Sequence, residues 1–238
     1  MAVKRVAILQ SSYIPWKGYF DIINAVDHFI LYDDAQYTKN DWRNRNRIKT
    51  AAGPRWLTIP VRTEGRFGQA IKDVEVADTR WAAKHWKSLV THYAKARFSG
   101  ELFAPLSDCY TKAAVLPKLG EINELFIRRI CGLLGIETSI ARSMDYNLNG
   151  DRVDRLIGLC QQVGASEYLS GPAAKSYLDE TRFNEFGIAV RWMDYAGYPP
   201  YPQLHSPPFL HDVTVLDLLL NVGLERAEDY LLAARTLP

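Results

Sequence analysis

The chain has 238 residues, of which 47% are hydrophobic and 24% are charged, a composition that suits one large folded domain. Its 29 lysines and arginines and its 27 aspartates and glutamates leave a formal net charge of +2. This balance excludes a whole-molecule attraction to nucleic acid or to anionic membranes. Any anion site must therefore come from a local cluster of basic side chains.

The three cysteines, Cys109, Cys131 and Cys160, lie far apart in apolar helical surroundings and form no metal-binding pair. They predict buried thiols in a reducing cytosol. The first apolar run is too short for the core of a signal peptide, and no segment approaches the ~20 apolar residues of a membrane span. We expect a soluble, cytoplasmic protein without a membrane partner.

Apolar runs predict buried strands at residues 6–9, 28–32 and 56–59, with a helical stripe between the first two. Helical spacing follows over residues 81–98 and 119–134, where Gly135 marks the stop. We expect this helical stretch, roughly residues 78–135, to form a lobe or insertion on the same sheet.

Strands and helices alternate again after the helical stretch. Short strands are predicted at residues 136–140, 168–169 and 188–192, and Asn149 or Asp151 is expected to cap a helix that ends at Gly164. A last helix over residues 215–221 has Thr214 as its expected N-cap and Gly223 as its stop. This alternation predicts βαβ crossovers, and hence a single α/β domain over residues 1–238 with a mostly parallel, Rossmann-like sheet.

The loop after the first strand offers groups that bind anions. Gln10 follows that strand directly, and Tyr13, Lys17 and Gly18 lie in the aromatic turn that leads into the first helix. Ligands of open parallel sheets bind at the carboxyl ends of the strands, where a helix N-terminus and a glycine allow close approach of an anion. The alternative is an aromatic turn that serves packing alone.

Polar residues also follow the second strand. Asp33, Asp34 and Gln36 stand at the neighbouring carboxyl end. Carboxylates in this position can bind ribose hydroxyls, hold a divalent cation or act as a general base. Capping of a turn or helix is the structural alternative, and the residues fix no metal site.

A basic run comes next. If the segment is extended, Arg43, Arg45 and Arg47 point to one side and Asn44 and Asn46 to the other. Guanidinium groups bind phosphate or carboxylate in a bidentate manner, and three arginines on one face repel one another unless an anion lies among them. A solvated charged face and an RNA-binding surface are the alternatives, although a single basic run gives little support to nucleic acid.

Two clusters near the C-terminus complete the candidate site. Ser170 lies in a small-residue turn after a predicted strand, which suits either a loop over a ligand or a plain connection. Gln203 and His205 lie in a proline-rich loop, where His205 is a candidate proton shuttle or a surface residue. The histidine spacing of this loop matches no established zinc motif.

Many of these motifs together resemble the WbqC-like family of bacterial proteins, over nearly the whole chain. The matching residues are Gln10, Tyr13, Pro15, Trp16, Gly18, Tyr19 and Phe20; Asp33, Asp34, Gln36 and Tyr37; Trp42, Asn44, Arg45, Asn46, Arg47, Ile48 and Lys49; Trp56, Leu57, Pro60 and Val61; Tyr168, Leu169, Ser170, Gly171, Ala174, Tyr177 and Leu178; Tyr201 and Gln203; and Leu216, Asp217, Leu218, Asn221 and Gly223. Thr214 stands where the family usually has serine, and it keeps the hydroxyl.

The resemblance implies work on activated sugars, because the family is often encoded in surface-polysaccharide (O-antigen) gene clusters. It suggests that an acyl or aminoacyl group is attached to an amino sugar. The element order also resembles nucleotidyltransferase-like Rossmann enzymes, but Trp16-Lys17-Gly18-Tyr19 replaces their His-x-Gly-His signature. That second likeness is therefore an analogy of fold alone.

The leading hypothesis is a transferase or amide-forming ligase whose partner is a nucleotide-linked amino sugar. In this scheme Lys17, Arg43, Arg45 and Arg47 hold phosphates, Asp33 or Asp34 binds ribose or deprotonates the amine, Gln10 and Asn44 orient the substrate, and His205 moves a proton. The alternatives are a glycosyltransferase that holds a metal-bound diphosphate on Asp33 and Asp34, and a non-catalytic nucleotide-sugar-binding protein. The acyl donor, the oligomeric state and the use of ATP or Mg²⁺ stay open.

Overall fold

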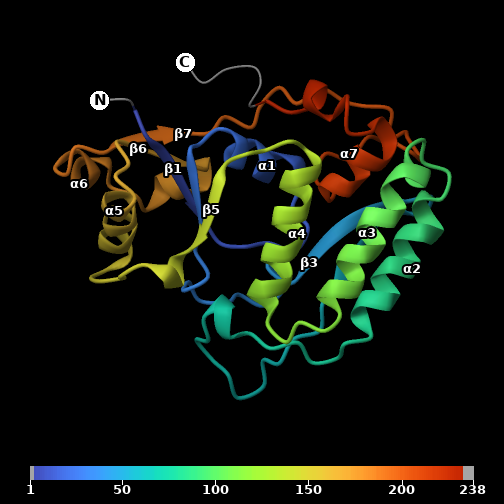
Figure 1. Cartoon of the computed structure of the whole chain (residues 1–238), viewed down its shortest axis with the longest axis horizontal. Coiled ribbons are helices and arrows are strands. Elements are labelled where there is room, and N and C mark those ends of the chain that lie inside the picture. Colours follow the sequence, from blue (N-terminus) through green and yellow to red (C-terminus); the bar gives the residue numbers. More distant parts are fainter. Residues whose placement is uncertain (1–2, 233–238) are drawn as a thin grey trace.

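A parallel sheet of five strands organises residues 3–232, the part of the chain that the computed structural model describes (Figure 1). The strands are β1 (Arg5–Leu9), β2 (His28–Leu31), β5 (Ser139–Arg142), β6 (Glu167–Ser170) and β7 (Ala189–Trp192). They lie in the order β5-β2-β1-β6-β7. The chain therefore adds strands on one side of β1 and then on the other, which makes the gap between β1 and β6 the topological switch point. The predicted Rossmann-like α/β fold is confirmed.

Strand β1 is enclosed on both edges and both faces. Its edges pair with β2 and β6. Its side chains alternate between two cores, with Ala7 in the core on the α1 side and Val6 and Ile8 in the core on the α5 side. A strand in these surroundings needs apolar side chains at successive positions, which explains the continuous apolar run in the sequence.

The crossover helices cover opposite faces of the sheet. They are α1 (Lys17–Asn24), α5 (Arg152–Gln162) and the short α6 (Glu180–Asn184). Apolar residues of α1 pack into the first core, and those of α5 and α6 pack into the second. Asp151 caps α5, as predicted, because its carboxylate accepts hydrogen bonds from the backbone N–H groups of Val153 (2.8 Å) and Asp154 (2.9 Å).

Three long helices precede β5 and stand side by side in Figure 1: α2 (Trp81–Tyr93), α3 (Ser99–Ala113) and α4 (Leu119–Leu133). They share the first core with α1 and with α7 (Val215–Val222). The helix expected over residues 81–98 ends early, at Tyr93. The backbone N–H of Phe98 donates instead to the Leu220 carbonyl of α7 (3.0 Å), which fixes the turn from α2 into α3. Thr214 caps α7 through its hydroxyl, as expected.

The strand predicted at residues 56–59 does not join the parallel sheet. It forms β4 (Gly53–Thr58), which pairs antiparallel with β3 (Arg45–Thr50) in a separate two-stranded sheet. The connection between β3 and β4 is a tight turn, with Gly53 at φ 102°. A turn of this length cannot cross a sheet to a parallel neighbour, so the segment must return as a hairpin.

The predicted burial of the three cysteines is confirmed. Cys109, Cys131 and Cys160 are free and buried, and burial raises the pKa of each thiol to about 12. Across residues 3–232, no helix combines the length and the apolar character that a bilayer crossing requires.

A buried polar cluster joins the loop after β1 to the three-helix segment. The Tyr13 hydroxyl lies 2.9 Å from Nδ1 of His85 and 2.9 Å from the Tyr110 hydroxyl. Burial lowers the pKa of His85 from 6.5 to about 4, and a hydrogen bond with the Thr58 backbone offsets this only in part. The imidazole is therefore neutral in the folded protein at neutral pH.

This cluster predicts acid sensitivity. Between pH 6.5 and about 4 the unfolded chain protonates His85 while the folded chain does not, so the free energy of unfolding falls as the pH is lowered through this window. Urea unfolding at pH 7.0 and 4.5 measures how much the free energy of unfolding decreases between the two pH values. We expect this decrease to be about 2–3 kcal/mol smaller in His85→Gln than in the wild type. His205→Gln, on an exposed loop, is the control and should keep the wild-type loss. Equal losses in wild type and His85→Gln would contradict the assignment.

Candidate substrate-binding site

A pocket of about 810 Å³ opens at the carboxyl ends of β1 and β6, where the strand order reverses. Its lining residues are Ile8, Leu9, Gln10, Tyr32, Asp34, Ala35, Gln36, Arg43, Gly68, Gly150, Asp151, Arg152, Arg155, Leu156, Tyr168, Ser170, Gly171, Ala173, Ala174 and Tyr177. We call it the switch-point pocket. Its volume lies in the range of small-molecule sites, and its position is the one where open α/β sheets bind ligands.

The acidic side chains of this pocket already have partners in the protein. Asp34 forms an ion pair with Lys72 and accepts a hydrogen bond from the Ser143 hydroxyl (2.7 Å). Asp151 caps α5 and forms an ion pair with Arg182 (3.1 Å). Their negative charges are therefore compensated outside the pocket.

Two arginines of the pocket have no such compensation. Arg152 stacks on Tyr177, with its guanidinium carbon 3.5 Å from the ring centroid, and Nε of Arg155 donates to the Gly150 carbonyl (3.2 Å). Neither guanidinium has a carboxylate partner within residues 3–232. The pocket therefore carries positive charge that an anionic ligand can neutralise.

Arg43 is held at the end of β1. Its Nη1 donates to the carbonyl oxygens of Gln10 (3.0 Å) and Ser11 (3.1 Å), and its Nε lies 3.6 Å from the Asp41 carboxylate. The Gln10 carbonyl also accepts a hydrogen bond from the Tyr19 hydroxyl (3.0 Å). Two residues from separate predicted motifs, Gln10 and Arg43, thus meet at one strand end.

Asp33 and Asp34, which are neighbours in the sequence, lie in different surroundings. Asp33 is buried and accepts a hydrogen bond from the Ser11 backbone N–H (2.8 Å), and it does not line the pocket. Burial raises the pKa of Asp33, while the hydrogen bonds from Ser11 lower it to a smaller extent. A Cβ at Gly120 would lie 2.8 Å from Asp33 Oδ2, so a larger residue of α4 here would displace the Asp33 carboxylate. Asp34, by contrast, lines the pocket together with Gln10, as the order of the predicted strands indicates.

A second, smaller cavity of about 400 Å³ adjoins the first. It is lined by Leu9, Ser12, Pro15, Trp16, Tyr19, Trp42, Arg43, Asn46, Tyr195 and Asp212. We call it the aromatic pocket. Trp16 and Tyr195 form one wall, with ring centroids 5.2 Å apart and ring planes inclined at 65° in an edge-on contact. Leu9 and Arg43 line both cavities, so the end of β1 is their common boundary.

The basic run divides between the pockets and a hairpin face. The alternation is confirmed, because Asn44, Asn46 and Ile48 are buried while Arg45 and Arg47 are only half-buried. Arg45 and Arg47 line neither pocket. They lie over the Trp56 ring, at 4.2 and 5.2 Å from its centroid. The two guanidinium groups thus make cation–π contacts on this face.

Further contacts hold the basic run in place. Arg47 forms an ion pair with Asp212, and Arg45 donates to the Asn40 carbonyl. The Asn44 amide donates to the Ile59 carbonyl (2.9 Å), and the Asn46 amide donates to the Ile14 carbonyl (2.7 Å). Asn46 thereby joins β3 to the loop after β1 while it lines the aromatic pocket.

Three predicted residues of the first loop are structural in this arrangement. Tyr13 is fully buried in the cluster with His85. Lys17 is buried with its Nζ 4.5 Å from the Tyr198 ring centroid, and burial lowers its pKa to about 8. Gly18 leaves room for an indole, because a Cβ there would lie 2.4 Å from the Trp16 ring. None of the three lines either pocket, although the Trp16 ring that Gly18 accommodates does.

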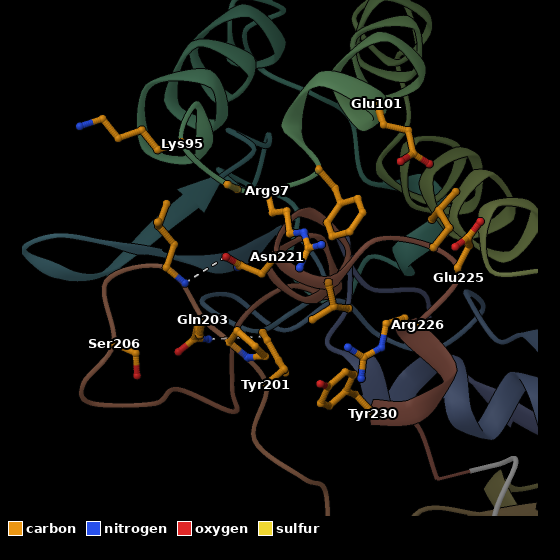
Figure 2. Close-up of a pocket in the computed structure, with 16 residues that line it drawn as sticks. Lys95, Arg97, Glu101, Tyr201, Gln203, Ser206, Asn221, Glu225, Arg226 and Tyr230 are labelled. Carbon is orange, nitrogen blue, oxygen red and sulfur yellow. Dashed lines mark hydrogen bonds between the residues drawn. The ribbon is translucent and has the colours of Figure 1, made fainter.

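Gln203 lies beside a third cavity, of about 800 Å³, next to α7 (Figure 2). Its oxygen accepts hydrogen bonds from Lys49 Nζ (2.8 Å) and the Leu210 N–H (2.9 Å), and its nitrogen donates to Asp217 (2.6 Å). Figure 2 shows Gln203 next to Tyr201, whose hydroxyl also donates to Asp217 (2.6 Å). Gln203 is thus part of a buried polar network and not of the switch-point pocket.

Two of the remaining predicted residues lie in the switch-point pocket and one lies outside it. Ser170 and Gln36 line the switch-point pocket. His205 is exposed on the proline-rich loop with φ 61°, and it lines none of the three cavities described here.

Sequence reasoning missed several pocket residues. Arg152 and Arg155 follow the predicted cap of α5 in the helix's first two turns, and a helix that precedes a parallel strand must begin at the carboxyl edge of the sheet. Their place in the site could therefore have been inferred. Tyr195 and Asp212 come from irregular loops, and no periodic pattern marks them.

Comparisons with known proteins agree with the extent of this fold. The sequence model of the WbqC-like protein family matches residues 10–229. An uncharacterized protein of Mycobacterium tuberculosis (strain ATCC 25618 / H37Rv), Rv1507c, is 49% identical over 229 residues, which cover 96% of this chain and 98% of that protein. The range matched by the family model includes every residue of both pockets except Ile8 and Leu9.

The contact of Gly18 with Trp16 gives a test of the pocket wall. Gly18→Ala should lower the free energy of unfolding by about 1–3 kcal/mol, because the added methyl group displaces the indole ring. Gly132→Ala is the matched control, since this exposed glycine of α4 has no atom within 4 Å of an added Cβ. It should raise stability by up to about 1 kcal/mol. Urea unfolding measures both, and a neutral Gly18→Ala would show that Trp16 is free to move.

Proposed function

The chain belongs to the WbqC-like protein family, and we propose that it is an enzyme that attaches an acyl or aminoacyl group to the amine of a nucleotide-linked amino sugar. This activity would serve surface-polysaccharide or related biosynthesis. The observation that carries the proposal is the switch-point pocket, in which two arginines without a carboxylate partner face a cavity of about 810 Å³.

The pocket supplies the groups that a nucleotide needs. Arg43, Arg152 and Arg155 are the candidate phosphate ligands, since guanidinium groups bind phosphate through charge-assisted hydrogen bonds. Lys72 and Ser143 fix the side-chain conformation of Asp34. Its carboxylate can therefore accept hydrogen bonds from ribose hydroxyls without first changing its conformation. Ribose binding is one of the three functional roles that the sequence suggests for it, beside cation binding and general-base catalysis.

The proposed reaction requires little from the protein beyond positioning. The amine nitrogen of the sugar attacks the carbonyl carbon of an activated acyl donor and forms the C–N bond of the amide. The bond to the donor's leaving group breaks, the leaving group departs with the bonding electrons, and the proton of the amine passes to the leaving group or to solvent. Holding both reactants in one geometry removes a large part of the entropic barrier of such a step. A pocket that fixes the nucleotide, with a second cavity at its edge, is suited to this task.

The arrangement gives less support to a glycosyltransferase that holds a metal ion on Asp33 and Asp34. The Asp33 carboxylate is directed at Ser11 and α4, whereas that of Asp34 is directed at Lys72 and Ser143. The two carboxylates therefore have separate partners instead of a shared one.

A ligand screen followed by a turnover assay tests the proposal. UDP, GDP, dTDP and CMP are added to the protein with and without Mg²⁺, and the melting temperature is recorded, because a ligand of the native state raises it by mass action. The amino-sugar conjugate of the best nucleotide is then incubated with acyl-coenzyme A, or with amino acids and ATP, and amide formation is followed by mass spectrometry. If a nucleotide binds but no product forms, the non-catalytic alternative is favoured, and if no nucleotide binds, the proposal is wrong.

Arginine variants test which guanidinium groups bind the phosphates of the nucleotide. Arg152→Ala and Arg155→Ala should each weaken binding of the best nucleotide about ten- to a hundredfold, because each removes a charge-assisted contact of roughly 1.5–3 kcal/mol. Arg45→Ala is the matched control, since Arg45 lies over Trp56 and lines neither pocket. Isothermal titration calorimetry measures the three dissociation constants. Loss of affinity in Arg45→Ala alone would place the phosphate site on the hairpin.

A further inference from the structure

We infer that the aromatic pocket holds the sugar ring of the nucleotide-linked substrate, so that the two cavities form one bipartite site with the phosphates at their boundary. The inference rests on the proposed function, which assigns the nucleotide to the switch-point pocket. It adds the place of the sugar and the groups that recognise it.

The two cavities adjoin at three places. Leu9 and Arg43 line both of them. Gly171 lines the larger one, and a Cβ placed on it would lie 3.7 Å from the hydroxyl of Tyr195, which lines the smaller one. Arg43 and the Gly171–Tyr195 pair therefore lie at the boundary of the two cavities.

The boundary offers hydrogen-bond donors to phosphate. Nε of Arg43 is buried and has no hydrogen-bond partner, although it lies 3.6 Å from Asp41 Oδ2. The Tyr195 hydroxyl likewise has no hydrogen-bond partner in the part of the chain that the structure describes. Burial raises the pKa of Tyr195 to about 12, so the phenol is protonated at neutral pH and can donate. Donors that lack a partner in the protein are suited to a ligand's acceptors.

The aromatic pocket matches the two-sided chemistry of a sugar. Trp16, Tyr19 and Trp42 present ring surfaces, against which the C–H face of a pyranose can pack. The Ser12 hydroxyl has no hydrogen-bond partner among the described residues. The Asp212 carboxylate forms an ion pair with Arg47 through Oδ2, and its side chain is more than half exposed. These groups can bind the sugar's hydroxyls and its positively charged amine.

Size and charge assign the sugar to this cavity. The aromatic pocket is half the volume of its neighbour, about 400 against 810 Å³, and a monosaccharide is smaller than a nucleoside. Arg152 and Arg155 line only the larger cavity, whereas the carboxylate of Asp212 lines only the smaller one. A ligand with an anionic nucleotide end and a cationic amino-sugar end is complementary to this distribution.

Calorimetry with UDP, UDP-glucose and UDP-glucosamine separates this inference from the proposed function; if another nucleotide is best in the screen, its corresponding conjugates replace them. The wild type should bind UDP-glucosamine more tightly than UDP, and Trp42→Ala should reduce that advantage about five- to tenfold while it leaves the affinity for UDP unchanged. Trp56→Ala is the matched control, because Trp56 is as exposed as Trp42 (41% and 39%) and lies beside it but outside both pockets.

Two further variants make the test independent of any single substitution. Asp212→Asn should abolish the preference for UDP-glucosamine over UDP-glucose, and Tyr195→Phe should weaken all three ligands by a similar severalfold factor. Circular dichroism verifies that each variant is folded. If UDP binds but its conjugates bind no more tightly, or if Trp42→Ala and Trp56→Ala behave alike, the inference is overturned and the proposed function stands. If no nucleotide or conjugate binds the wild type, both are overturned.

Discussion

The site depends on the enclosure of β1. This strand is paired on both edges and packed on both faces, and its carboxyl end is where the chain order reverses. Arg43 reaches this end from a different segment and binds the carbonyl groups of Gln10 and Ser11. The same guanidinium then forms part of both pockets. One buried strand thus fixes the position of the cavities, of their boundary and of the charge between them.

Charge compensation separates binding residues from structural ones. Around the switch-point pocket, Asp34 and Asp151 are neutralised by Lys72 and Arg182, which leaves arginines of the pocket uncompensated. On the β3–β4 hairpin the reverse holds, because tryptophan rings and Asp212 already surround the guanidinium groups. A basic run in a sequence therefore does not identify an anion site until the partners of each arginine are known.

The sequence was informative where a local pattern determines structure. The apolar run of β1, the Asp151 cap of α5 and the Thr214 cap of α7 could all be predicted, because each depends on neighbouring residues. The alternation in residues 43–47 was also correct, but the partners of that face come from Trp56 and Asp212, which distant segments supply. The hairpin was missed because an apolar run does not reveal which strand it pairs with. The loops that carry Tyr195 have no periodicity, so only the folded structure places them.

The volumes of the cavities do not distinguish the candidate site from the cavity beside α7. The cavity beside α7 is almost as large as the switch-point pocket, about 800 against 810 Å³, yet its chemistry differs (Figure 2). Its buried polar groups, Gln203 and Asn221, are already hydrogen-bonded to the protein. On its rim, Arg226 is paired with Asp229 (3.1 Å). A ligand there would have to replace bonds that the protein has made, whereas at the switch point it would complete contacts that the described part of the chain leaves open.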